Sequence, residues 1–281
     1  MILSASTSQT LAAALASELD EALATVDYDR FPDGEQHLTI PTLDGDRAVV
    51  VASTTSDAAL VQLLQLQDAA REAGASEITT VLPYMGYARQ DAAFHPGEPV
   101  SARAVARAVS TGTDRVVTVN VHEPDVCDFF TVPAENVDAA PRLADPLPSL
   151  RDPVFLSPDE GALALATGVR DAYGGGEVDY FQKTRHSGTD VDVTPSDTVV
   201  DGRDVVVVDD IVATGNTMSE AIGCLDAPNR VYVATVHPLL AGSARTKLAA
   251  AGVTQIYGTD TIERAVSDVS AAPAVADVLQ D

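Results

Sequence analysis

The chain has 281 residues, is 46% hydrophobic and carries a formal net charge of −25, from 42 Asp and Glu against 17 Lys and Arg. This length suits two modest domains, with enough apolar residues to form a core in each. The negative charge argues against nucleic-acid binding, and no apolar run reaches the roughly 18 to 20 residues that span a membrane.

Short β-branched runs alternate with amphipathic stretches of helical length along the first half of the chain. The expected strands there are 47–53, 77–83 and 115–121, and the expected helices are 57–73 and 100–110. The segment 139–152 is rich in Pro and Asp and shows little periodicity, so it is the best internal boundary. We therefore expect domains at 1–141 and 142–281.

The same alternation continues in the second half. The expected strands are 154–157, 174–182, 205–208, 230–237 and 255–258, and the expected helices are 160–172, 217–226 and 243–251. A last helix is expected from 262 to the end, interrupted near Pro273, and its part from 266 onward is expected to pack back on the first domain. Continuous apolar strands between helices predict an α/β fold, with a mainly parallel sheet flanked by helices in each domain.

One apolar strand ends on a pair of like charges. In VVVVDDIVATGNTM, residues 205–218, the strand is followed by Asp209 and Asp210. The loop after them consists of Ala213, Thr214, Gly215, Asn216 and Thr217. Ligands of parallel sheets bind beyond the carboxyl ends of the strands, and N–H groups at a helix start hold phosphate. Because the acids can accept hydrogen bonds from sugar hydroxyls, a phosphorylated sugar is favoured over an ordinary loop capped by Thr217.

Two segments of the first half present polar side chains at turns. FPDGEQ combines an aromatic ring, a turn and two carboxylates, at Phe31, Asp33, Gly34 and Glu35; taken alone, it is typical of a surface turn. YMGYARQD follows the strand 77–83 and contains Arg89 and Gln90. An arginine at a sheet edge can bind phosphate oxygens in pairs, although an exposed salt bridge is the ordinary alternative.

Single polar residues end two further strands. His122 follows the strand 115–121, where an imidazole can contact a metal-bound nucleotide, although a lone histidine is more often structural. Asp159 follows the strand 154–157 and is typical of a helix N-cap, a role that is compatible with holding Mg²⁺ through water. Lys183 and Arg185 alternate before a loop rich in Gly and Thr. They are candidates for stabilising phosphoryl oxygens, against the usual alternative of solvated surface.

Lysine is scarce in this acidic chain. Only Lys183 and Lys247 occur, which leaves 15 of the 17 basic residues as arginines. Molar salt shortens the Debye length to about 3 Å and screens repulsion among carboxylates, so the composition favours a halophilic protein over a merely acidic mesophilic one. Cys127 and Cys224 match no metal-binding spacing and are expected to be buried in a reducing cytoplasm. MILSASTSQT lacks the features of a secretion signal, which also favours a cytoplasmic location.

Residues 209–217 resemble the 5-phosphoribosyl 1-pyrophosphate (PRPP) motif, which phosphoribosyltransferases share with ribose-phosphate pyrophosphokinases. The segments FPDGE, YARQD, VHEPDVCDFF, SPDEGA, KTR and DDIVATGNT occur in the order typical of the pyrophosphokinases. The chain resembles that family over nearly its whole length. The resemblance implies two phosphoribosyltransferase-like domains, an ATP-contributing one followed by a ribose-5-phosphate-binding one. It also implies transfer of the diphosphoryl group of ATP to the 1-hydroxyl of ribose 5-phosphate, with release of AMP.

The resemblance also implies roles for individual residues. ATP would be bound by Phe31, Asp33, Gly34, Glu35, Arg89 and Gln90. Ribose 5-phosphate would be bound by Arg185, Asp209, Asp210 and the loop Ala213, Thr214, Gly215, Asn216 and Thr217. Lys183 and Arg185 would be catalytic, on a loop that closes over the diphosphoryl group, and His122 and Asp159 would hold Mg²⁺. A homo-oligomer, at least a dimer, is implied because the FPDGE segment of this family reaches a neighbouring subunit's nucleotide site.

Some residues depart from the family pattern. Asn216 stands where the phosphate loop usually has Gly, and Glu123 and Asp128 add acids near His122. Two alternative functions remain: a phosphoribosyltransferase, which consumes PRPP together with a base, and a non-catalytic paralogue that binds nucleotides. Retention of Lys183 and Arg185 weighs against the paralogue. Formation of AMP from ATP and ribose 5-phosphate alone would distinguish the pyrophosphokinase from both.

Overall fold

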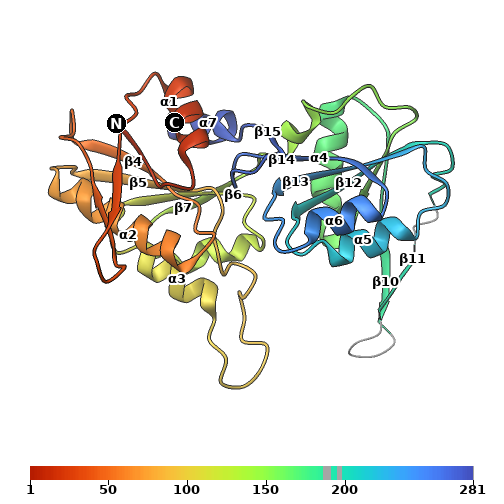
Figure 1. Ribbon diagram of the computed structural model, residues 1–281, viewed down its shortest axis with the longest axis horizontal. Helices are drawn as coiled ribbons and strands as arrows, with labels where there is room; N and C mark the ends of the chain where they lie inside the picture. The colour runs from red at the N-terminus through yellow and green to blue at the C-terminus, as the bar shows by residue number, and fades with distance from the viewer. Residues whose placement is uncertain (186–190, 195–197, 281) are drawn as a thin grey trace. The chain divides into compact units, whose positions relative to one another are not determined.

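The computed structural model describes residues 1–185, 191–194 and 198–280, with residues 182–185 and 191–194 described by their backbone alone. The chain packs as two compact units (Figure 1). The first consists of Met1–Asp138, Asp260–Glu263 and Ser270–Asp281, and the second of Ala139–Thr259 and Arg264–Val269. The first unit therefore includes segments from both ends of the chain. None of the helices in the described part of the chain has the length and apolar character needed to span a membrane.

The first unit is built on a five-stranded parallel sheet. Its strands, in spatial order, are β1 (Ile2–Ser4), β4 (Arg47–Val51), β5 (Glu77–Leu82), β6 (Arg115–Val119) and β7 (Ala134–Val137). Central residues such as Val50, Ile78 and Val81 are fully buried. Burial on both faces explains why these strands are continuous β-branched runs in the sequence.

Helices cover both faces of this sheet. They are α1 (Gln9–Leu19), α2 (Asp57–Glu72), α3 (Ser101–Val109), the 3₁₀ helix η1 (Pro124–Phe129) and α7 (Ala272–Gln280). Figure 1 shows α2 and α3 on one face, with α1 and α7 together on the other. The hydroxyl of Ser56 accepts the N–H of Ala59 at 3.2 Å and so caps α2. Leu63 and Leu66 of α2 are fully buried against the sheet.

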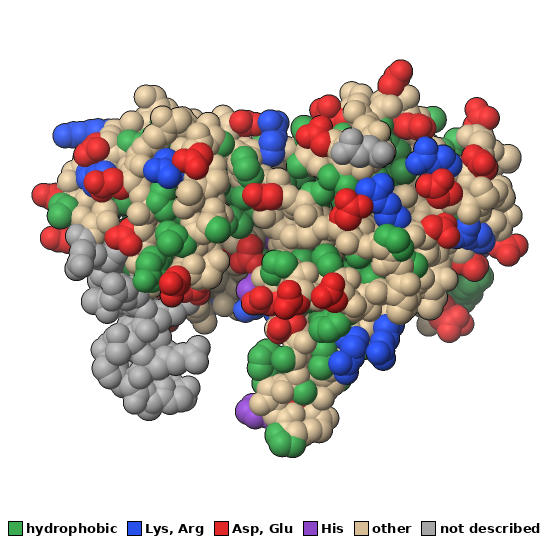
Figure 2. Space-filling view, turned by 180° about the vertical axis from the view of Figure 1, so that it is seen from behind, with side chains coloured by type: hydrophobic (Ala, Val, Ile, Leu, Met, Phe, Trp, Pro, Cys, Tyr) green, Lys and Arg blue, Asp and Glu red, His purple; other side chains and the backbone are tan. Residues whose placement is uncertain are grey.

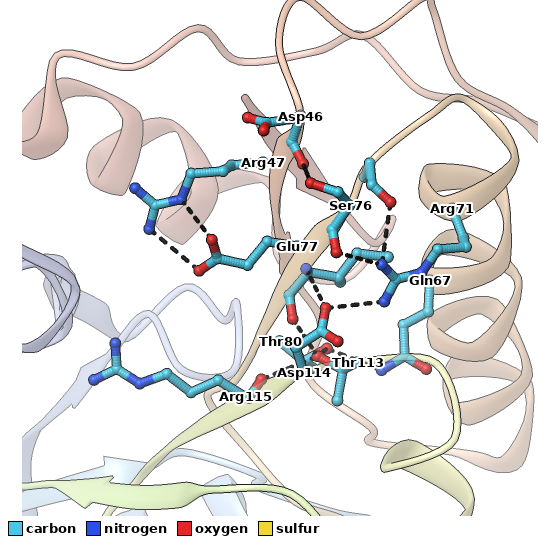
Figure 3. Close-up of polar contacts among 12 residues, drawn as sticks. Asp46, Arg47, Gln67, Arg71, Ser76, Glu77, Thr80, Thr113, Asp114 and Arg115 are labelled. Carbon is cyan, nitrogen blue, oxygen red and sulfur yellow. Dashed lines mark hydrogen bonds and ion pairs between the residues drawn. The ribbon is translucent and has the colours of Figure 1, made fainter.

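A polar network ties α2 to the amino ends of the central strands (Figure 3). Asp114 Oδ2 accepts hydrogen bonds from Ile78 N at 2.7 Å and from Arg71 Nη2 at 2.9 Å. Arg71 Nη1 also donates to the Ser76 carbonyl at 2.8 Å. The bond from Ile78, against the opposing effect of burial and with help from Arg71, lowers the pKa of Asp114. The network fixes the edge of the sheet that lies away from the strands' carboxyl ends.

The second unit is built on a six-stranded parallel sheet. Its strands, in spatial order, are β15 (Ser267–Val269), β14 (Val253–Thr259), β13 (Arg230–His237), β12 (Asp204–Ile211), β8 (Val154–Ser157) and β9 (Glu177–Tyr180). Its helices are η2 (Ala140–Ala144), η3 (Glu160–Ala162), α4 (Leu163–Tyr173), α5 (Asn216–Gly223) and α6 (Ala244–Ala250). Figure 1 shows α4 on one face and α5 with α6 on the other.

The amino end of β12 is anchored by a buried carboxylate. Asp204 accepts hydrogen bonds from Arg230 Nη2 at 2.6 Å, from Asn229 Nδ2 at 2.7 Å and from Arg151 N at 2.7 Å. Burial raises the pKa of Asp204, but the hydrogen bonds from Arg230, Arg151 and Asn229 outweigh it, so the pKa lies below its usual value. The strand that carries Asp209 and Asp210 is therefore held firmly at its opposite end.

Two expectations from the sequence are wrong. Residues 262–271 do not begin the last helix, because Ser267–Val269 forms the edge strand β15, paired with β14. The helix α7 starts only at Ala272 and has Pro273 in its first turn, where a missing N–H costs nothing. Cys224 is exposed, because it follows the last residue of α5 at the surface, whereas Cys127 is partly buried.

Candidate active site

Two carboxylates end β12 at the carboxyl end of the second sheet, and a third follows the neighbouring strand. Asp209 and Asp210 are among the last residues of β12, which extends to Ile211, and their side chains are partly buried. Asp159 follows the neighbouring strand β8, which pairs directly with β12. Burial first, and then the negative charges of Asp210 and Asp159, raise the pKa of Asp209 well above its usual value. The fold thus concentrates negative charge at this edge and gains from a cation or hydroxyl donors placed there.

The loop after β12 has an arrangement suited to anions. Gly215 has φ 72° and directly precedes α5, so it is the helix cap, and the predicted alternative of Thr217 as the cap is wrong. Within the described part of the chain, the backbone N–H groups of Thr214, Gly215 and Asn216 donate to no protein acceptor. Free amides at the positive end of a helix dipole favour an anion.

A second segment supports the loop from outside. Leu240 N donates to the Val212 carbonyl at 2.8 Å, and Ala241 N donates to the Ala213 carbonyl at 2.8 Å. A Cβ at Gly215 would lie 3.4 Å from Ala244, an ordinary contact distance, so this position favours glycine for its positive φ rather than for space. The loop is therefore fixed by neighbouring backbone rather than by its own side chains.

The predicted catalytic cations lie on a separate hairpin. β10 (Gln182–Arg185) and β11 (Val191–Thr194) form an antiparallel pair, in which Lys183 is opposite Val193 and Arg185 is opposite Val191. The side chains of Lys183 and Arg185 lie outside the described residues. Because they are two positions apart on one strand, both belong to the same face of the hairpin.

The predicted nucleotide segment of the first unit is the tip of a hairpin. β2 (Asp27–Arg30) and β3 (Gln36–Thr39) pair antiparallel, and Gln36 Nε2 donates to the Ala58 carbonyl of α2 at 2.7 Å. At the tip, Gly34 has φ 94°, and Asp33 Oδ1 accepts the N–H of Glu35 at 3.1 Å. The ring of Phe31 is 49% exposed and lies 5.1 Å from the His37 ring. The tip thus presents an aromatic face beside carboxylates.

Arg89 and Gln90 follow a constrained turn after β5. Gly86 lies so close to Thr54 that a Cβ would be 2.2 Å from the Thr54 carbonyl oxygen. Tyr87 has φ 67°, and its hydroxyl donates to Asp57 Oδ1 at 2.5 Å. Arg89 is exposed, whereas Gln90 is partly buried with its side-chain oxygen bonded to the Ser101 hydroxyl. Arg89 is thus available to a ligand, and Gln90 also helps to fix the start of α3.

His122 lies in the first unit, just beyond β6, and is exposed. β5 and β6 are parallel neighbours, so His122 and the Arg89 segment emerge at the same edge of the sheet. Glu123 and Asp128 are exposed in the same region. Among the described residues, no three or more His, Cys, Asp or Glu side chains gather into a group that could hold a metal ion. The predicted metal residues His122 and Asp159 belong to different units.

Two residues of these segments, Tyr87 and Lys247, were not among the predicted site residues. Tyr87 holds a left-handed backbone conformation that is rare for an aromatic residue, and a single sequence shows no sign of it. Lys247 of α6 donates from Nζ to Asn216 Oδ1 at 2.5 Å. The scarcity of lysine was a signal for Lys247, just as it was for Lys183.

Known proteins resemble this chain over its whole length. Residues 1–112 match the N-terminal domain of ribose phosphate pyrophosphokinase, and residues 148–270 match the phosphoribosyl transferase domain. A ribose-phosphate pyrophosphokinase of Halobacterium salinarum is 70% identical over 99% of this chain and 100% of its own length. One from Methanopyrus kandleri is 45% identical over 100% of this chain and 99% of its own length.

A solved structure also resembles this chain over its whole length. The crystal structure of phosphoribosylpyrophosphate synthetase from Mycobacterium smegmatis has a TM-score of 0.81 and 28% sequence identity, and the match covers 100% of this chain and 97% of that one. The parallel sheets flanked by helices are therefore domains of the phosphoribosyltransferase type, as predicted. Together with the matches of both domains, this shows that the chain belongs to the ribose-phosphate pyrophosphokinase family.

Proposed function

We propose that this protein transfers the diphosphoryl group of ATP to the 1-hydroxyl of ribose 5-phosphate, giving PRPP and AMP. The proposal rests on one observation. A loop suited to anions follows two carboxylates at the end of the same strand, and these carboxylates can accept hydrogen bonds from sugar hydroxyls. The N–H groups of Thr214, Gly215 and Asn216 are free of protein acceptors in the described structure, and Asp209 and Asp210 lie near the end of the strand before them. Membership of the pyrophosphokinase family supports this reaction over that of a phosphoribosyltransferase, which consumes PRPP together with a base.

Ribose 5-phosphate fits this edge of the second unit. Its phosphate would accept hydrogen bonds from the loop 213–217, where the dipole of α5 adds positive potential. Its ribose hydroxyls would donate to Asp209 and Asp210. Because burial and neighbouring acids raise the pKa of Asp209, its carboxylate gains more from hydroxyl donors than an exposed one does.

Mg²⁺ fits the chemistry of the same edge. Asp159, Asp209 and Asp210 offer oxygen ligands, and their mutual repulsion is relieved by a cation. Mg²⁺ keeps several waters and commonly binds through one or two carboxylates together with substrate phosphates, so a larger protein cluster is not needed. We propose Asp159 as the Mg²⁺ residue of the second unit and His122 as that of the first unit, each at the carboxyl end of its own sheet. When bound, the ion would neutralise charge on the transferred phosphoryl oxygens.

ATP would be bound by the predicted residues of the first unit. The exposed Phe31 ring offers a stacking surface to the base, beside Asp33, Gly34 and Glu35. The exposed guanidinium of Arg89 can pair with phosphate oxygens, and Gln90 follows it. The hairpin tip is exposed, which suits the family's use of this segment in a neighbouring subunit, so a homodimer is proposed as the smallest active form.

The reaction requires positioning and charge stabilisation. The 1-hydroxyl oxygen of ribose 5-phosphate attacks the β-phosphorus of ATP, the bond from that phosphorus to the α,β-bridging oxygen breaks, and AMP leaves as the hydroxyl proton is released. Lys183 and Arg185 would stabilise the charge that spreads over the phosphoryl oxygens. Closure of their hairpin would exclude water, which otherwise hydrolyses ATP.

The test is an assay for AMP in molar KCl. ATP, ribose 5-phosphate and Mg²⁺ together should yield equal amounts of AMP and PRPP, and omission of any one should abolish both products. Ribose without the phosphate serves as the matched control for the loop. PRPP consumption with a nucleobase, in the absence of AMP formation from ATP and ribose 5-phosphate, would identify a phosphoribosyltransferase and overturn the proposal.

A further inference from the structure

Lys247 is joined to the phosphate loop by a direct hydrogen bond. Its Nζ lies 2.5 Å from Oδ1 of Asn216, the first residue of α5. Lys247 is partly buried, whereas Asn216 is exposed. The chain has only one other lysine, Lys183. A lysine beside the phosphate loop is therefore not expected by chance.

The surrounding backbone fixes the position of this lysine relative to the loop. Ala244, three residues earlier on α6, is the residue against which Gly215 packs. Residues three apart lie on the same side of a helix, so Lys247 and Ala244 face the loop together. The bonds from Leu240 and Ala241 to the carbonyls of Val212 and Ala213 hold the same segment against the other end of the loop.

The chemistry of the two side chains defines what they offer a ligand. An ammonium group has only donors, so it binds the amide oxygen of Asn216 and leaves the two Nδ2 hydrogens as donors. Within the described structure, no acceptor takes a hydrogen from Asn216 Nδ2. The free backbone N–H groups of Thr214 and Gly215 lie in the same loop. Side-chain and main-chain donors are therefore available together.

A cation beside the phosphate loop would offset the repulsion between a bound phosphate and the acidic protein. Asp209, Asp210 and Asp159 stand close to the loop and repel a phosphate dianion. The formal net charge of −25 adds to this repulsion at low salt. In molar salt the Debye length is about 3 Å, so arginines elsewhere on the surface are screened. A cation in hydrogen-bond contact with the loop, as Lys247 is, retains its effect.

We infer that Lys247 is a positioning residue for the phosphate of ribose 5-phosphate. It acts through Asn216, whose amide it orients, and brings one positive charge to the loop. This inference rests on the proposed function, because the anion is taken to be the sugar phosphate. It assigns a role to the asparagine that replaces the usual glycine of the loop: the side chain extends the set of donors and links them to a cation on α6.

The test compares Lys247→Met with Arg245→Met. Both substitutions remove one positive charge from α6, but Arg245 is exposed and makes no bond to the loop. We expect Lys247→Met to raise KM for ribose 5-phosphate about tenfold, as for loss of one charge-assisted hydrogen bond, with kcat and KM for ATP unchanged. Arg245→Met should change none of these. Lys247→Gln provides a second variant if the methionine disturbs folding, and Lys247→Arg should restore KM.

Asn216→Gly tests the coupling. If Lys247 acts through Asn216, Lys247→Met should raise KM much less in the Asn216→Gly background than in the natural chain. Thermal stabilisation by ribose 5-phosphate, with ribose as control, should follow the same order without catalysis. Absence of AMP from the natural enzyme would refute the proposed function. Normal AMP formation, with KM and ligand stabilisation unaffected by Lys247→Met and Lys247→Gln, would refute the inference alone.

Discussion

Asp209 lies in an environment that opposes its charge. Its side chain is partly buried, and Asp210 and Asp159 both repel its negative charge. A fold under selection for stability alone would replace such a group with a neutral one. Groups whose pKa is raised by burial and like charge are concentrated at functional sites, where the ligand supplies the missing partners. We therefore expect Asp209 to contribute to activity and to lower the stability of the ligand-free protein.

Replacing Asp209 by Asn separates these two effects. A carboxyl whose pKa is raised on folding loses stabilisation as pH rises through its folded pKa, so the charge is unfavourable at neutral pH. Asp209→Asn should stabilise the ligand-free protein at pH 7 and lower AMP formation by about 100-fold or more. Chemical denaturation between pH 4 and 8, in molar KCl, should show a smaller decline with pH for the variant. A less stable variant at pH 7 would contradict this assignment.

Lys183 should affect the chemical step rather than binding. A cation that contacts the transferred group stabilises charge mainly in the transition state. Lys183→Ala should reduce kcat by roughly 100- to 1,000-fold, with little change in ATP affinity measured by equilibrium titration. Lys183→Arg, which keeps the charge, should recover part of the loss. Near-normal turnover of Lys183→Ala would show that the catalytic role is misassigned.

At the level of the element, β12 links stability to the site. Its amino end begins at Asp204, whose carboxylate accepts hydrogen bonds from three residues, and Asp209 and Asp210 lie near its carboxyl end. β12 is fixed at its amino end and pairs with β13 and β8, so its last residues have a defined position along the sheet. The anchor at Asp204 therefore sets where the carboxylates emerge, although it makes no contact with them.

Asp204→Asn tests the anchor. The substitution removes the charge that Arg230 faces, and because Arg230 remains partly exposed we expect a loss of about 2 to 3 kcal/mol. The pKa of Asp204 is lowered on folding, so its contribution is present above its unfolded pKa and is lost as pH falls through the folded value. Urea denaturation at pH 7 and pH 3 should show the variant and the natural protein converging in acid. Asp201→Asn, at an exposed site nearby, is the matched control.

At the level of the whole molecule, acidic side chains greatly outnumber basic ones. Figure 2 shows Asp and Glu spread over the visible face of both units, with fewer Lys and Arg among them. The ion pairs of the described surface, such as Arg47 with Glu77 and Arg71 with Asp114, use only part of these carboxylates. Most of the acidic surplus therefore has no cation of the protein to balance it.

Salt should accordingly stabilise the fold. The Debye length falls from about 10 Å at 0.1 M to about 3 Å at 1 M, and with it the repulsion generated by a charge of −25. We expect the thermal midpoint to rise steadily between 0.1 and 3 M KCl. Sucrose at matched water activity, which does not screen charge, should give a smaller rise. Equal effects of sucrose and KCl would contradict the screening explanation.

The sequence predicted the longer buried strands, although it missed β1, which is fully buried but has only three residues. Strands such as β5 and β13 are long β-branched runs because both their faces are covered. It missed β2 and β3, whose residues DYDR and QHLT are polar, and β15, which has only three residues. These short strands depend on tertiary pairing rather than on local pattern.

In the site, likewise, residues that are close in sequence could be predicted together, whereas contacts between residues far apart in sequence could not. Asp209 and the loop 213–217 are contiguous, so their association could be predicted. The approach of Asp159 to Asp209 depends on β8 pairing with β12, and the bond from Lys247 to Asn216 depends on α6 packing beside α5. Neither contact leaves a periodic pattern in a single sequence, so the sequence suggested the residues but not their partners.

The chain passes between its two units four times, at 138/139, 259/260, 263/264 and 269/270. The last passage brings α7 to the first unit, where Arg115 Nη2 donates to the Val278 carbonyl at 3.1 Å. During synthesis on the ribosome, the amino-terminal unit consequently lacks one of its helices until translation has ended. A gene cut near codon 139 would likewise yield an amino-terminal fragment with an uncovered sheet face, whereas a permuted gene that begins with the codons for α7 would restore it.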